Sequence, residues 1–317
     1  MGNITPKGEI PSNTLKALAY IDTAICFILL VMLIITSRSL VRIAKKSPAL
    51  SSISLGYCAI ILLIIIEDLG FNFLMLEYAT LPIKMRARRP FHKEGPLFLF
   101  SVAITALKFY GRFVLILIHA INSLNRVCAV FFPLQYGTIF TTGRLFSLVS
   151  ATFVVCLPIL FIYAFQIWGC SYYFHPFDIG FYYYDMNTCY EVHEFVEWFL
   201  FTAILSSSII IDIVVGIFLF CRHKNTTTDA FKDIRDYGFV IQTFVLALTN
   251  GAFTLYFYLV GYYTLEIPLL DHLPKLNDLI LSFIYLVIIS VVNGVVRRDV
   301  MRTFSCSFKR VNSVNII

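Results

Sequence analysis

The chain has 317 residues and a net charge of +6, with 59% hydrophobic and only 14% charged residues. An average soluble domain has roughly 45–50% apolar and about 25% charged residues, so this composition excludes a soluble globular protein. Lipid must surround most of the chain. The Lys and Arg residues are scattered in short clusters beside apolar runs, which favours membrane lipid headgroups as their partners and indicates no nucleic acid.

Seven apolar stretches are long enough to cross a bilayer. They cover residues 17–37, 52–76, 97–124, 145–168, 196–220, 237–263 and 276–296. Open strand edges are not tolerated in hydrocarbon, and the alternating pattern of barrel strands is absent, so these stretches must be helices. The sequence therefore predicts an all-α membrane protein, a seven-transmembrane helix bundle that forms one domain over residues 1–317.

The distribution of Lys and Arg predicts the orientation of the bundle. With the N-terminus outside, the inner segments carry 15 of these residues and the outer segments carry 8. Because cytoplasmic loops are enriched in basic residues, residues 1–16 are expected outside and the tail 297–317 in the cytoplasm. The basic outer stretch 84–93 is the exception, and it would suit an anionic ligand or lipid. Asn3 begins a glycosylation sequence on the expected outer side.

Two cysteines fall in the outer segment between the fourth and fifth spans. Cys170 and Cys189 would there meet an oxidising environment, in which disulfides persist. We predict that they pair with each other. On the chain-entropy account, closing a loop of about 20 residues contributes about 3 kcal/mol to stability.

The third span carries a stripe of polar residues on one helical face. These are Lys108, Arg112, His119, Asn122 and Arg126. A bare cation in the middle of a bilayer costs at least about 2.5–3.5 kcal/mol, so Lys108 and Arg112 require carboxylates or water. Glu67 and Asp68 in the second span lie at a similar depth. Two interpretations remain open: these charges fasten two helices together, or they line a ligand cavity that opens outward.

Two further polar residues lie within spans. Asp212 is an isolated acid deep in the fifth span, and intramembrane acids are candidates for function. His119 lies low in the third span, where a packing role is favoured over a proton switch. The outer segment 172–184 is rich in Tyr and Phe, which fits an aromatic belt at the headgroups or, alternatively, a lid over a small ligand.

The inner end of the third span has a distinctive pattern. Residues 125–136 read Asn-Arg-Val-Cys-Ala-Val-Phe-Phe-Pro-Leu-Gln-Tyr. Taken alone, Pro133 predicts only that the helix stops. The spacing, however, resembles the Asp-Arg-Tyr-x-x-Ala-Ile-x-x-Pro-Leu-x-Tyr region of rhodopsin-like G-protein-coupled receptors, in the form found in nematode serpentine chemoreceptors. Within these, the chain is most similar to serpentine receptor class x.

The resemblance implies a chemosensory receptor of the plasma membrane that binds a small molecule outside and activates a heterotrimeric G protein inside. It assigns coupling roles to Asn125, Arg126, Pro133 and Tyr136. The chain departs from the pattern at Asn125, which replaces Asp, and in the absence of a cysteine near the outer start of the third span. Arg126 is expected to pair with an acid near the headgroups, and Asp233 and Asp236, just before the sixth span, are best placed by sequence.

The sequence contains no signature of an enzyme, a metal site or a phosphate-binding loop, so no catalytic residue and no cofactor are expected. A small transporter or channel is the alternative from another functional class. In that case the charges of the second and third spans would line a permeation path. The inverted repeats and broken helices common in transporters are absent from the sequence, which favours the receptor.

Overall fold

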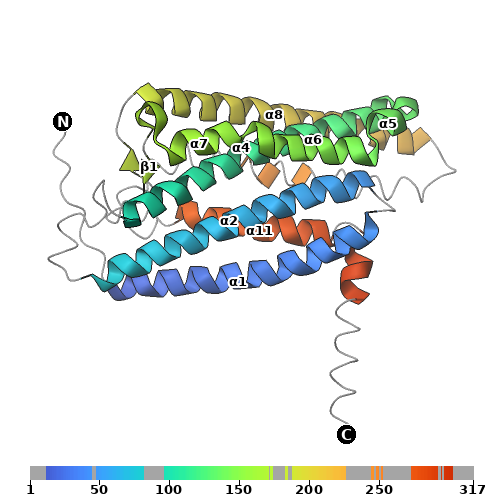
Figure 1. Ribbon diagram of the computed structural model, residues 1–317. Helices are drawn as coiled ribbons and strands as arrows, with labels where there is room; N and C mark the ends of the chain where they lie inside the picture. Colours follow the sequence, from blue (N-terminus) through green and yellow to red (C-terminus); the bar gives the residue numbers. More distant parts are fainter. Residues whose placement is uncertain are drawn as a thin grey trace, which may run out of the picture.

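A computed structural model of the chain describes residues 12–44, 48–81, 96–170, 172–173, 183–184, 188–225, 244–245, 248–249, 251–252, 273–291, 294 and 296–302. The described part is a bundle of long helices with one short hairpin (Figure 1). Its elements in chain order are α1 (Ser12–Ile43), α2 (Pro48–Thr80), α4 (Pro96–Phe131), α5 (Pro133–Ile139), α6 (Thr142–Val155), α7 (Leu157–Ala164), η1 (Ile167–Gly169), β1 (Tyr172–Tyr173), β2 (Tyr183–Tyr184), α8 (Thr188–Asn225) and α11 (Leu273–Val291).

Six of the seven expected spans coincide with described helices. Within the described residues, five helices are long and apolar enough to cross a membrane, and a sixth span arises if 278–291 and the bent segment 296–302 are taken together. Apart from three pairs of residues, the expected span 237–263 lies outside the described part of the chain. The helices α1, α2, α4 and α8 are longer than their apolar stretches. The longest apolar stretch lies in α4, which has 36 residues and a length of about 54 Å at 1.5 Å per residue, more than the roughly 30 Å of bilayer hydrocarbon.

Prolines mark where several of these helices begin. Pro48, Pro96 and Pro133 are the first residues of α2, α4 and α5. Proline suits this position because its fixed φ matches the helix and its missing N–H would lack an intrahelical partner there. Pro158 has a different effect, because it breaks the expected fourth span at Cys156 into α6 and α7. The apolar stretch 145–168, by contrast, predicts one continuous span.

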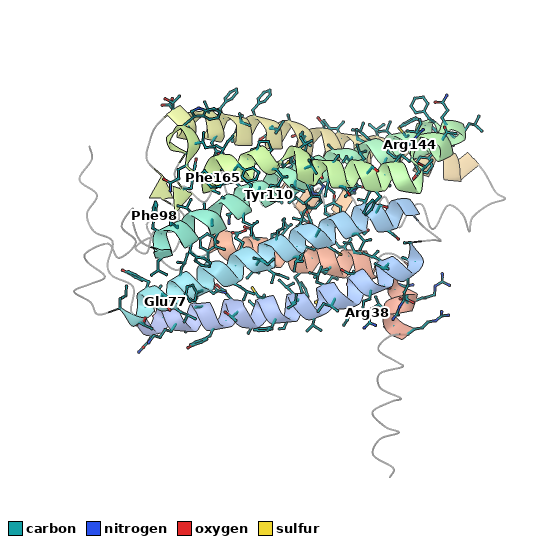
Figure 2. All side chains as sticks on the ribbon, viewed as in Figure 1. Arg38, Glu77, Phe98, Tyr110, Arg144 and Phe165 are labelled. Carbon is teal, nitrogen blue, oxygen red and sulfur yellow. A yellow bond between two sulfur atoms is a disulfide. The ribbon has the colours of Figure 1, made fainter. Side chains whose placement is uncertain are left out.

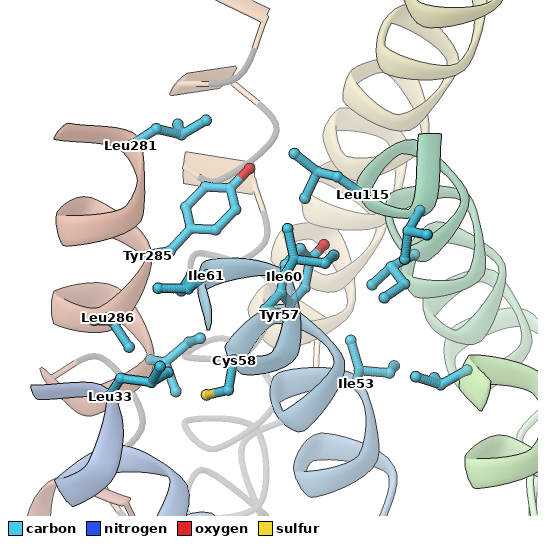
Figure 3. Close-up of a cluster of buried hydrophobic side chains, with 14 of the residues drawn as sticks. Leu33, Ile53, Tyr57, Cys58, Ile60, Ile61, Leu115, Leu281, Tyr285 and Leu286 are labelled. Atoms are coloured by element: carbon cyan, nitrogen blue, oxygen red, sulfur yellow. The ribbon is translucent and has the colours of Figure 1, made fainter. Parts of the chain in front are cut away.

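The third span, α4, is the most buried of the described spans. It packs against α2, α6, α7 and α8. Contact with α2 is close at Gly70, where a Cβ atom would lie only 2.5 Å from Ile104 Cδ1. The main hydrophobic core cluster includes Tyr57 on α2, Leu115 on α4 and Tyr285 on α11 (Figure 3).

The two ends of the bundle differ in their side chains. Arg38 and Arg144 lie toward one end, whereas Glu77, Phe98 and Phe165 lie toward the other (Figure 2). The second end carries the antiparallel hairpin, in which Tyr172 pairs with Tyr184. We refer to the end with Arg38 and Arg144 as the basic end and to the end with the hairpin as the hairpin end.

Candidate functional site

Arg126 and Asp212 form a buried ion pair near the basic end. Arg126 lies one and a half turns before the end of α4, and its Nη1 contacts Asp212 Oδ1 on α8. Both residues are about 2% exposed or less, and Arg126 Nε also donates to the carbonyl of Asn122 at 3.3 Å. Because a buried charge is costly unless it is paired, this contact ties α4 to α8.

This pairing differs from the sequence-based expectation for both residues. Asp212 was expected to be an isolated acid in a ligand pocket or an intramembrane charge pair, and it forms such a pair with Arg126 toward the basic end. Asp233 and Asp236, the acids that the sequence favoured as partners of Arg126, lie outside the described residues. Sequence position gives the depth of a residue along its own helix, whereas the pairing depends on which helices are neighbours.

The residue before Arg126 connects α4 to the short helix that follows. Asn125 Oδ1 accepts a hydrogen bond from the Tyr136 hydroxyl at 3.1 Å. Tyr136 lies on α5, which starts at Pro133 and has no buried residues. Leu134 on α5 is 96% exposed. An exposed helix with a large apolar side chain therefore lies directly after the segment that carries Arg126.

A second buried ionic cluster lies nearer the hairpin end. Lys108 Nζ on α4 is 3.1 Å from Glu67 Oε1 on α2 and 3.0 Å from Asp278 Oδ2 on α11. Glu67 and Lys108 are buried, whereas the Asp278 side chain is 24% exposed. Lys108 thus holds three helices together, which is the fastening arrangement considered from sequence. Sequence reasoning missed Asp278, although an acid inside an expected span was a usable signal.

The other charges considered with Lys108 have different surroundings. The Arg112 guanidinium lies over the ring of Phe201 on α8, 5.6 Å from its centroid, in a cation–π contact. Asp68, the residue that follows Glu67 in the sequence, is also buried. The structure forms one of the pairings that the sequence allowed as a direct ion pair, between Glu67 and Lys108.

His119 is a packing residue that joins three helices. Its Nδ1 is 3.1 Å from the hydroxyl of Tyr57 on α2, and its Nε2 is 2.9 Å from the hydroxyl of Tyr285 on α11. All three residues are buried. With both ring nitrogens in hydrogen bonds, His119 has the satisfied core environment that the sequence analysis favoured.

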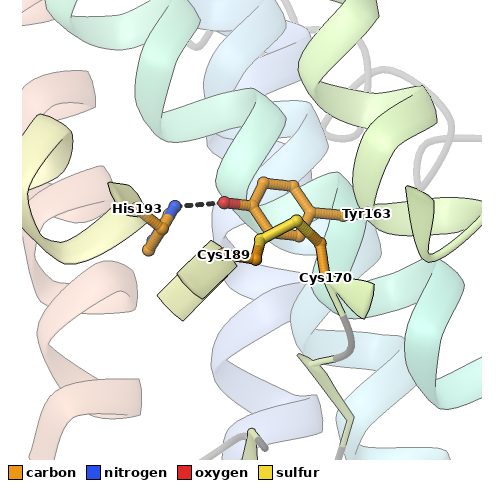
Figure 4. Close-up of a disulfide and its surroundings, with 4 residues drawn as sticks. All are labelled: Tyr163, Cys170, Cys189 and His193. Carbon is orange, nitrogen blue, oxygen red and sulfur yellow. Dashed lines mark hydrogen bonds between the residues drawn. A yellow bond between two sulfur atoms is a disulfide. The ribbon is translucent and has the colours of Figure 1, made fainter. Parts of the chain in front are cut away.

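The hairpin end contains an aromatic cluster beside a disulfide. The expected Cys170–Cys189 disulfide is present, with a Cα–Cα distance of 5.4 Å, and it fastens the segment after η1 to α8. Close to it, the Tyr163 hydroxyl and His193 Nδ1 share a hydrogen bond (Figure 4). Tyr172 packs edge-on against Phe109, with 4.7 Å between ring centroids, and is buried. The aromatic-belt interpretation therefore fails for Tyr172, which packs inside the bundle.

The sequence of the chain matches the model of a known protein family. Residues 93–297 match the sequence model of the family described as serpentine type 7TM GPCR chemoreceptor Srx. The match covers more than half of the chain and includes Arg126, Asp212 and the aromatic cluster, whereas Glu67 precedes it. A comparison with curated proteins finds no match. Asn3, the expected glycosylation site, lies outside the described residues.

Proposed function

The chain belongs to the Srx family of serpentine seven-transmembrane chemoreceptors, and we propose that it binds a small extracellular molecule and activates a cytoplasmic heterotrimeric G protein. The family consists of multi-pass membrane receptors and not of enzymes. The observation that carries the coupling proposal is the buried Arg126–Asp212 ion pair between α4 and α8.

The ion pair suits a two-state switch. A buried pair is stable only while both charges stay together, because separating them leaves each charge without compensation. Moving α8 away from α4 would therefore expose Arg126 in a new crevice at the basic end. A ligand that favours the separated state would shift the population toward it by its difference in affinity for the two states.

The surroundings of the pair suit a protein partner. Asn125 and Tyr136 hold α5 against the end of α4 through their hydrogen bond. On α5, Leu134 is almost fully exposed. Large apolar side chains that protrude beside a charged crevice are typical of docking surfaces. In this proposal α5 and the crevice around Arg126 together receive the G protein.

The ionic cluster of Lys108 disfavours the transporter alternative. A permeation path would need charges that face an open route, whereas Glu67 and Asp278 both contact Lys108 directly. This closed arrangement fastens helices. We therefore place the charges of the second and third spans in the framework of the receptor.

Co-reconstitution with a G protein tests the proposed function. A calcium readout in cells that express the chain first identifies an active molecule from a panel of volatile and water-soluble compounds. That molecule should then accelerate nucleotide exchange on a G protein reconstituted with the purified chain. Flux of the molecule into sealed vesicles that lack a G protein, without any change in exchange, would establish the transporter instead.

The proposed orientation places the basic end in the cytoplasm of the plasma membrane. Cations at this end include Arg42, Arg144 and Arg298, which are exposed, and positive charge is enriched on cytoplasmic sides. We expect an N-terminal tag to be labelled by antibody on intact cells, and a C-terminal tag to be labelled only after permeabilisation. The reverse pattern would put Arg126 on the wrong side and reject G-protein coupling.

A further inference from the structure

A cavity of about 400 Å³ lies at the hairpin end between α4, α7, η1 and α8. This volume is in the lower part of the roughly 300–1,000 Å³ range of small-molecule sites. Its walls are mainly apolar and aromatic, and they include Phe113, Ile162 and Val192. Tyr163 and His193 contribute polar atoms, and the Cys170–Cys189 disulfide forms part of the wall (Figure 4).

The cavity opens on the side of the bundle. Trp168 and Val192 both line it, and they are 81% and 58% exposed. Val192 lies at the start of the candidate span 191–218, and Trp168 lies four residues after the candidate span 143–164 ends. We therefore place this exposed rim at the outer edge of the bilayer. Trp168 lies beyond the end of α7, at the depth where Trp side chains prefer the boundary between headgroups and hydrocarbon. A molecule dissolved in the bilayer would therefore reach the cavity directly from the membrane.

The rim is held in an unusual backbone conformation. Gln166 and Trp168 have φ values of 53° and 57°, in the left-handed region that residues with side chains rarely adopt. Such strained backbone concentrates at ligand sites. Here it places the Trp168 side chain at the mouth of the cavity.

We propose that this lateral cavity binds a small, uncharged, lipid-soluble molecule with one hydrogen-bonding group. The inference deepens the proposed function, on which it rests, by naming the ligand class. The apolar walls favour hydrocarbon or aromatic ligands. Among the described residues that line the cavity, none is Asp, Glu, Lys or Arg, so an ionic ligand would lose its hydration without compensation from them. The Tyr163 hydroxyl and His193 supply the polar contact that orients the ligand.

The cavity and the Arg126–Asp212 pair join the same two helices. Phe113 on α4 lines the cavity and packs edge-on against Phe201 on α8, with 5.7 Å between ring centroids. An occupant would push on this contact at the hairpin end, while the ion pair clamps α4 to α8 toward the basic end. Occupancy is thereby linked to the separation of α4 from α8 that the proposed function requires.

Photolabelling in lipid nanodiscs tests the site without a G protein. The probe is octanol that carries a diazirine group, and unlabelled octanol is the competitor. We expect saturable labelling of the peptide segments around Trp168 and Val192. Val192→Trp fills the cavity and should reduce this labelling at least tenfold. Val214→Trp is the matched control, because Val214 is an exposed valine of the same helix outside the cavity, and labelling should stay unchanged.

A second variant tests whether a loss of labelling reflects a filled cavity or a misfolded protein. Ile162→Trp fills the cavity from α7 and should give the same loss, with thermal unfolding of each variant measured alongside. Labelling that excess octanol does not reduce, or that persists in both filled variants, would overturn the site. Failure here with normal ligand-evoked nucleotide exchange rejects the cavity alone. Saturable labelling without any exchange response to an active molecule rejects the G-protein function and keeps the cavity.

Discussion

Replacing Asp212 by Asn should raise ligand-free nucleotide exchange about tenfold. The substitution keeps the shape of the side chain but removes the charge that holds Arg126 and α8 together. Arg126 then remains buried without its carboxylate, which favours the state in which α8 has moved and water reaches the guanidinium. A bias of about 1.4 kcal/mol corresponds to the tenfold change in population. The measurement is nucleotide exchange on a reconstituted G protein in the absence of ligand.

Two further variants define what this result means. Asp299→Asn removes an acid that pairs with the half-exposed Arg42 at 3.5 Å, and such surface pairs contribute at most about 1 kcal/mol, so exchange should change little. Arg126→Ala combined with Asp212→Asn removes both buried charges and should abolish exchange while surface expression persists. Basal exchange at the unaltered level in a well-folded Asp212→Asn protein would contradict the proposed switch.

The helices were predictable because long runs of apolar residues give a strong hydropathy signal. Each span needs about 20 apolar residues, and six of these stretches correspond to described helices. The ends were less predictable, since α8 continues to Asn225, five residues past the expected apolar stretch. The break at Cys156 depends on the local effect of Pro158, which a hydropathy window averages away.

The candidate site was predictable in its residues but not in its pairings. The polar stripe of α4 identified Lys108, His119 and Arg126, because a polar face cannot point at lipid. Their partners Asp278, Tyr285 and Asp212 lie 170, 166 and 86 residues further along the chain. Single-sequence patterns give depth and helical face, but they do not give the order of helices around the bundle, and this order decides which side chains meet.

Replacing Lys108 by Met should lower the free energy of unfolding by about 3–5 kcal/mol, the range for breaking a buried ion pair by removing one partner. Two carboxylates, Glu67 and Asp278, would then face each other across α2 and α11 without the cation that lies 3.1 and 3.0 Å from them. We expect a large fall in the thermal unfolding midpoint of the purified protein and a loss of surface expression. Lys16→Met is the matched control, because Lys16 lies only half-buried in the first two turns of α1.

Adding Glu67→Gln to Lys108→Met should restore most of the lost stability. The remaining acid, Asp278, keeps about a quarter of its side-chain exposure, so water can hydrate it once the buried Glu67 charge is gone. This rescue separates the two interpretations of the cluster. If Lys108 served mainly to bind ligand, Lys108→Met would leave thermal stability unchanged and abolish the ligand response, and Glu67→Gln would not rescue it. Because Lys108 contacts acids from two other helices, we expect the loss in stability and its rescue.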